Sequence, residues 1–163
     1  MHCSWCMKAW VIDLSAARQQ VEQHRSLRAK AASLRKLIGL CPPSPAEDPT
    51  GQEQLDRWRT ELLSALSHLD RELRAHFEHE EASPLYADPD AQFARFQAEL
   101  TELIEEHTRL LDMLQGLRAE VRPRQARQLA KDTESFLNLL RAHEEAENRI
   151  LTAAYGEDLG AGD

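Results

Sequence analysis

Four stretches of the chain place apolar residues three and four positions apart, which is the spacing of residues on one face of a helix. Each of these faces also carries a histidine, and two of them carry a glutamate four residues after it. The polar residues on these faces are His24, His76, Glu80, His107, His143 and Glu147. Because all four apolar faces must be buried for the chain to fold, we expect these imidazoles and carboxylates to point into the interior that the helices share.

The composition agrees with a helical fold. The 163 residues include only six glycines and are rich in Leu, Ala, Glu, Arg and Gln, which are favourable in helices. A chain of this length suits one domain that buries about two-thirds of its unfolded surface, so its core needs no disulfide. We therefore predict an all-α, up-down-up-down antiparallel four-helix bundle over residues 10–156, with an N-terminal tail of residues 1–9 and a C-terminal tail of residues 157–163.

Proline and capping residues mark where the first two helices end and begin. The first helix, residues 10–40, stops where three prolines fall within positions 42–45, because proline removes a backbone donor. The second helix opens with a capping box formed by Thr50 and Glu53 and ends near residues 83–86. For His24 and His76 to lie at one level, the linker between these helices must run back along the bundle.

The third and fourth helices are joined by a short connection. The third helix follows Asp88, which can cap it, with Pro89 in the first turn. It gives way to the fourth helix at Arg122 and Pro123, a connection short enough to require an antiparallel neighbour. The fourth helix ends at Gly156, which we expect to adopt the left-handed conformation that terminates many helices.

Charge and hydropathy exclude several classes of protein. The formal net charge is −8 and the pI is near 5.4, whereas nucleic-acid-binding proteins concentrate Lys and Arg. No apolar run approaches the length of a membrane span, and no basic region followed by a long apolar one begins the chain. We expect neither a nucleic-acid nor a membrane partner, and a cytoplasmic location. Cys3 and Cys6 are then reduced thiols, with a zinc half-site or redox pair as the alternative.

The two inward glutamates require a positive partner. A bare buried carboxylate costs several kcal/mol, on the order of the penalty for an unpaired buried charge. Arg28, one turn from His24, could serve one carboxylate but does not explain four inward histidines. Two divalent cations would account for the whole set, because carboxylates on facing helices of a bundle commonly hold such pairs. Iron and manganese accept mixed nitrogen and oxygen ligands, and zinc is an alternative.

The pattern His24, His76-x-x-x-Glu80, His107, His143-x-x-x-Glu147 resembles the hemerythrin-like cation-binding domain, also called the HHE domain. The resemblance covers about residues 10–156. It implies two iron ions joined by an oxo or hydroxo bridge, with both glutamates bridging the irons and the four histidines as terminal ligands. Oxygen-carrying members have a second histidine on the third helix, where this chain has Leu111. The iron sensor of the same fold has an acid where this chain has Phe77.

Further polar residues lie next to the six. His79 and Glu81 fall at the edge of the site, where we expect solvated roles or contacts to the ligands. Glu106 either orients an imidazole or faces water. His68 is expected on the surface and His2 in the tail.

These observations favour a non-haem di-iron protein that binds, senses or reacts with O2, peroxide, nitric oxide or iron itself. Its partner would be a small diatomic or peroxide ligand at the positions of the irons that the protein leaves open. One alternative is a di-iron oxidoreductase that scavenges peroxide or nitric oxide, or resembles the proteins that repair iron centres. Another is a metal-free structural bundle that acts through a protein partner.

Overall fold

The computed structural model describes residues 14–43, 51–83, 94–122 and 124–156, and within them the side chains of all but 14–21, 94 and 154–156. This part of the chain forms four long α-helices: α1 (Leu14–Gly39), α2 (Gln52–Glu81), α4 (Gln97–Glu120) and α5 (Ala126–Gly156). A 3-10 turn, η2 (Ala94–Phe96), precedes α4, and no strand occurs among the described residues. The fold is thus all-α, as the apolar spacing predicts.

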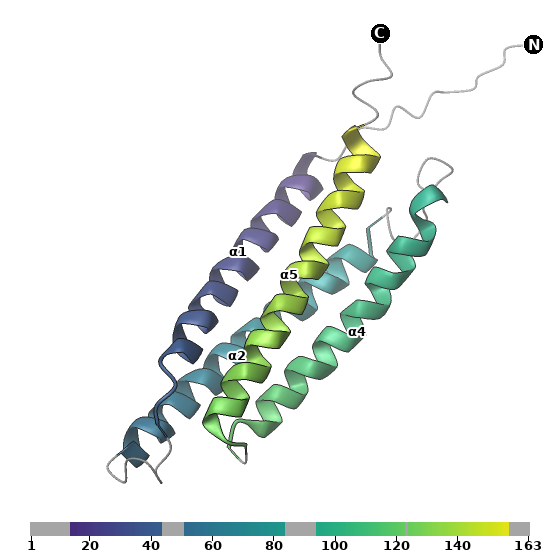
Figure 1. The fold of residues 1–163 in the computed structure, drawn as a ribbon. Coiled ribbons are helices and arrows are strands. Elements are labelled where there is room, and N and C mark those ends of the chain that lie inside the picture. The colour runs from purple at the N-terminus through teal and green to yellow at the C-terminus, as the bar shows by residue number, and fades with distance from the viewer. Residues whose placement is uncertain (1–13, 44–50, 84–93, 123, 157–163) are drawn as a thin grey trace, which may run out of the picture.

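The four helices form a closed ring in which consecutive helices run in opposite directions (Figure 1). Helix α1 packs against α2 and α5, and α4 packs against the same two helices. This arrangement confirms the predicted up-down-up-down bundle. Among the described helices there is no candidate for a membrane-spanning segment.

The register between α1 and α2 brings their histidines to one level. The indole Nε1 of Trp58 donates a hydrogen bond of 2.9 Å to the carbonyl oxygen of Leu37, near the end of α1. The start of α2 therefore extends past the end of α1 (Figure 1). The sequence requires this offset, because more residues precede His76 in the second helix than follow His24 in the first. Farther along, the ammonium of Lys30 lies 2.6 Å from Glu72 and fixes the same register.

The apolar interior is divided into a large and a small cluster. The large cluster fills most of the bundle and includes Leu73 and Phe77 of α2, Leu110 of α4 and Leu140 of α5. The small cluster is built on three buried residues of α4 and α5: Leu100, Leu103 and Ile150. Along α4, His107 comes between Leu103 and Leu110, so the predicted site residues form a polar layer between the two clusters.

Several predicted helix ends differ from the structure or fall outside it. Helix α2 begins at Gln52 with Gly51 as its N-cap and no side-chain capping bond. The predicted capping box depends on Thr50, which lies outside the described residues. Regular α-helix starts at Gln97, after the 3-10 turn, which is later than predicted.

The prediction for Gly156 is wrong. It is the last residue of α5, and no glycine in the described ranges has a positive φ. The two predicted tails, the start of the first helix before Leu14 and residues 84–93 lie outside the described residues.

Candidate metal centre

The six polar residues of the helical faces meet at one level of the bundle. Every helix contributes: α1 and α4 one histidine each, α2 and α5 a histidine and the glutamate four residues later. All six side chains are buried, with 1–2 % of their surface exposed: His24, His76, Glu80, His107, His143 and Glu147. Since residues four apart lie one above the other on a helix, each glutamate reaches the layer of its own histidine.

The six residues form two groups that share both carboxylates. One group is His24, His76, Glu80 and Glu147, and the other is Glu80, His107, His143 and Glu147. Within each group, one ligand atom from every residue lies within 4.8 Å of the others. The geometry therefore offers two neighbouring positions for cations, with both carboxylates common to the two positions.

Each carboxylate turns one oxygen toward each position. Oε1 of Glu80 lies 3.1 Å from Nε2 of His76, while its Oε2 lies 3.6 Å from Nε2 of His107. Oε2 of Glu147 lies 3.4 Å from Nε2 of His24, while its Oε1 lies 3.1 Å from Nε2 of His143. A carboxylate placed in this way can join two cations.

A comparison of the chain with known families agrees with this geometry. The family model described as the hemerythrin HHE cation-binding domain matches residues 15–155. The chain belongs to this family. No curated protein and no solved structure matches the chain.

The donor set of this HHE domain fits a cation. Two ligands at right angles on one ion, with bonds of about 2.1 Å, lie about 3 Å apart. The Nε2 atoms of His24 and His76 are 3.2 Å apart, although two nitrogens can share only one hydrogen bond. The nitrogen to carboxylate distances of 3.1–3.6 Å given above fall in the same range. Four imidazoles and two carboxylates form a mixed nitrogen and oxygen set that suits divalent transition metals.

The pKa values show how the two carboxylates act on the imidazoles. Burial lowers the pKa of His24, but hydrogen bonds and charge from Glu147 and Glu80 outweigh burial and raise it to about 9. Burial raises the pKa of Glu147, yet hydrogen bonds from three of the histidines hold it well below its usual range. The pKa of His143 is likewise raised, against burial, by Glu147 and Glu106. The HHE site thus favours positive charge beside its carboxylates, which protons can supply when no cation does.

Hydrogen bonds outside the site orient three of the imidazoles. Nδ1 of His107 donates to Glu81 at 2.8 Å, and Nδ1 of His143 donates to Glu106 at 2.9 Å. A proton held on Nδ1 leaves the lone pair on Nε2, which is the nitrogen that faces the centre. The structure thus selects between the two roles considered for Glu106: it orients an imidazole. Glu81 does the same.

The third such contact involves a residue that the sequence analysis missed. Nδ1 of His76 lies 3.4 Å from the amide oxygen of Gln23, which directly precedes His24 on α1. No spacing rule marks Gln23, because its position faces the neighbouring helix rather than the apolar interior.

The structure also shows the partner of Arg28, which is a second residue that the sequence analysis missed. Arg28 was expected to serve one inward carboxylate, and its Nε pairs with Glu144 at 3.3 Å. Glu144 is buried, with 5 % of its surface exposed, and burial raises the pKa of its carboxyl while His24 and Arg28 oppose the rise. Its position three residues before Glu147 places it near the same helical face, a signal that could have been used.

Phe77 closes the centre toward the large apolar cluster. Its ring stacks on His107 with centroids 3.8 Å apart and planes 7° from parallel, and its edge contacts His143. Leu111, at the position where oxygen carriers have a further histidine, packs against the same cluster. His79 is part of neither metal-ligand group, and His68 is exposed, as expected. His2, Cys3 and Cys6 lie outside the described residues.

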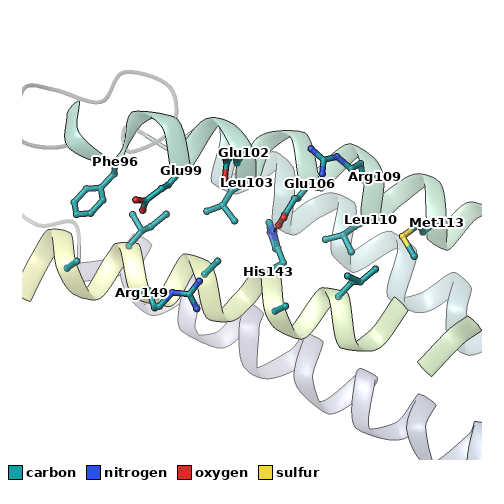
Figure 2. Close-up of a pocket in the computed structure, with 15 residues that line it drawn as sticks. Phe96, Glu99, Glu102, Leu103, Glu106, Arg109, Leu110, Met113, His143 and Arg149 are labelled. Carbon is teal, nitrogen blue, oxygen red and sulfur yellow. Dashed lines mark hydrogen bonds and ion pairs between the residues drawn. The ribbon is translucent and has the colours of Figure 1, made fainter. Parts of the chain in front are cut away.

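A surface groove lies beside the centre and extends to the outer side of His143. It has a volume of about 780 Å³, runs between α4 and α5, and its lining includes Glu106 and His143. Figure 2 shows these two side chains pointing toward each other across the groove. Water can therefore reach the outer hydrogen bond of His143, while the Nε2 atom stays buried.

Proposed function

We propose that this HHE domain is a non-haem di-iron protein in which Glu80 and Glu147 bridge two irons and the four histidines bind them from either side. The observation that carries the proposal is the direction of the two carboxylates, each of which turns one oxygen to each cation position. Membership of a cation-binding family supports it. Iron accepts imidazole and carboxylate ligands together, and manganese and zinc, which also bind these ligand types, are the alternatives.

The number of ligands supports a role in binding small molecules. Two imidazole nitrogens and two carboxylate oxygens give each cation four protein ligands, and Leu111 supplies no further one. Iron with four protein ligands has open positions for O2, peroxide or nitric oxide, and it supplies Lewis-acid and one-electron chemistry there. The surrounding residues would keep the four imidazoles in the orientation that presents Nε2, and Phe77 would exclude water from the side of the large cluster.

Metal analysis of purified protein tests the proposal. Protein loaded anaerobically with ferrous iron should contain two irons per chain, and its ultraviolet-visible spectrum should change on exposure to air. Glu147→Ala, which removes a shared carboxylate, should lose most of the metal and His76→Ala at least one of the two cations, whereas His68→Ala, which changes an exposed histidine, should retain both. Equal retention in all three variants would contradict the assignment.

Kinetics on the iron-loaded protein separates binding from turnover. A sensor binds peroxide or nitric oxide once, with a spectral change that saturates at the iron concentration. Catalytic consumption of either ligand would identify an oxidoreductase instead. A cytoplasmic location stays a prediction from the sequence.

A further inference from the structure

The two cation positions of the proposed centre share both glutamates but differ in everything else that surrounds them. The α4/α5 position is the one that His107 and His143 face, and the α1/α2 position is the one that His24 and His76 face. Because Glu80 and Glu147 serve both, a difference between the positions must come from the residues behind the histidines.

Behind the α4/α5 position stand two carboxylates. Glu81 accepts from Nδ1 of His107 at 2.8 Å and Glu106 accepts from Nδ1 of His143 at 2.9 Å. Both glutamate side chains are about half exposed, at 46 % and 43 %, whereas the rings that they contact are buried. A carboxylate that accepts the Nδ1 proton increases the basicity of the opposite nitrogen and fixes the direction of the ring.

Behind the α1/α2 position no such pair exists among the described residues. His76 faces the neutral amide oxygen of Gln23, and the distance of 3.4 Å is long for a hydrogen bond. The carboxylate of Glu144 lies near this side and interacts by charge with His24 and His76. It is paired with Arg28 at 3.3 Å, one turn from the contact between His24 and Glu147 on the same two helices, and no hydrogen bond joins it to either ring among the described residues.

The positions therefore differ in that two short hydrogen bonds join histidine Nδ1 atoms to carboxylates behind the α4/α5 position and none is found behind the α1/α2 position among the described residues. We propose that the α4/α5 position binds its cation first and more tightly, and that Glu81 and Glu106 are the positioning residues responsible. This inference rests on the proposed two-cation centre and adds an order of filling to it. Loss of such an outer partner typically lowers metal affinity by about 10- to 100-fold. At limiting metal the protein would then hold one cation, between α4 and α5, and the second would complete the centre.

Titration with cobalt(II) tests the inference without any assay of activity. Metal-free protein is titrated against a competing chelator, and the visible spectrum of bound cobalt reports each step. We expect two separate steps in the unmodified protein. Glu81→Gln and Glu106→Gln should each weaken the first step by about 10- to 100-fold.

Matched variants separate the hydrogen bonds from charge alone. Glu78→Gln and Glu102→Gln remove the same charge from exposed positions on α2 and α4 and should leave both steps within about 3-fold of the unmodified protein, since exposed charges are well screened. Gln23→Glu places a carboxylate behind the α1/α2 position and should tighten the second step. A purely structural role for Glu81 and Glu106 would lower the unfolding midpoint of the metal-free protein and leave the cobalt affinities unchanged.

Half-site variants identify which position fills first. His24→Ala keeps both histidines of the α4/α5 position and should bind one cobalt tightly, whereas His143→Ala should bind it more weakly. The reverse order, or two steps that the Glu81 and Glu106 variants shift no more than their controls do, would overturn the inference. If the alanine variants do not fold, the glutamine variants at partly exposed positions still decide it. Two tightly bound cations with indistinguishable steps would contradict the order of filling but support the two-cation centre. An unmodified protein that binds no cation would contradict both the order of filling and the proposed centre.

Discussion

The metal-free protein should lose stability as the pH rises through the neutral range. His24 has a pKa near 6.5 in an unfolded chain and about 9 in the folded one, because Glu147 and Glu80 outweigh the effect of burial. A group whose pKa is raised on folding stabilises the fold below its unfolded pKa, and that stabilisation is lost as the pH passes its folded pKa. The difference between these two pKa values corresponds to roughly 3 kcal/mol, at about 1.36 kcal/mol for a tenfold change in proton affinity.

The assay is urea denaturation of chelator-treated protein between pH 6 and pH 10. The free energy of unfolding should fall by about 3 kcal/mol over this range, which is a large share of the 5–15 kcal/mol typical of a domain. His143, whose pKa is also raised, acts in the same direction. Bound metal should abolish the fall, because a cation replaces the protons that the imidazoles carry.

His24→Gln provides the critical comparison. This variant should have a flatter dependence on pH, whereas His68→Gln, at an exposed position, should keep the slope of the unmodified protein. A metal-free protein whose stability is constant from pH 6 to pH 10, or a His24→Gln variant with an unchanged slope, would refute the role assigned to the buried carboxylates.

Four further predictions concern stability. Phe77→Ala removes a buried ring from the large cluster and from its stack on His107, and should cost about 3–5 kcal/mol by urea denaturation. Leu139→Ala, at a side chain 51 % exposed, should change stability by less than about 0.5 kcal/mol. Asp70→Asn weakens the ion pairs of buried Asp70 with Arg118 and Arg74. The free energy of unfolding should fall by about 1–2 kcal/mol, because both arginines are partly solvated. A loss above about 4 kcal/mol would contradict this estimate. Cobalt at about 100 times its dissociation constant should raise the thermal midpoint by about 5–10 °C, since it adds about 2.7 kcal/mol. The rise should be smaller in Glu147→Ala, which removes a carboxylate common to both positions.

The sequence predicts both the helices and the residues that point inward, because both follow from the 3.6-residue period of the α-helix. A helix turns once in 3.6 residues, so an apolar stripe that contains His143 and Glu147 fixes which way both side chains point. The same rule placed His24 and His107, although each is a lone histidine on its helix.

Contacts between helices could not be predicted in the same way. Whether Glu106 meets His143 or water depends on how α4 and α5 are rotated and offset, and no local pattern encodes that. Gln23 was missed for this reason. The left-handed conformation predicted for Gly156 is wrong because propensity at helix ends is weak and the surrounding chain decides it.

The polar layer separates two apolar clusters of unequal size. Among the described residues, one side of the layer holds the many large side chains of the large cluster, and the other holds Leu100, Leu103 and Ile150 with the four partly buried residues that pack against them. The proposed cations would hold the four helices together beside the small cluster, because their ligands come from all four helices. Removal of the cations should therefore loosen the helices beside the small cluster more than those around the large one.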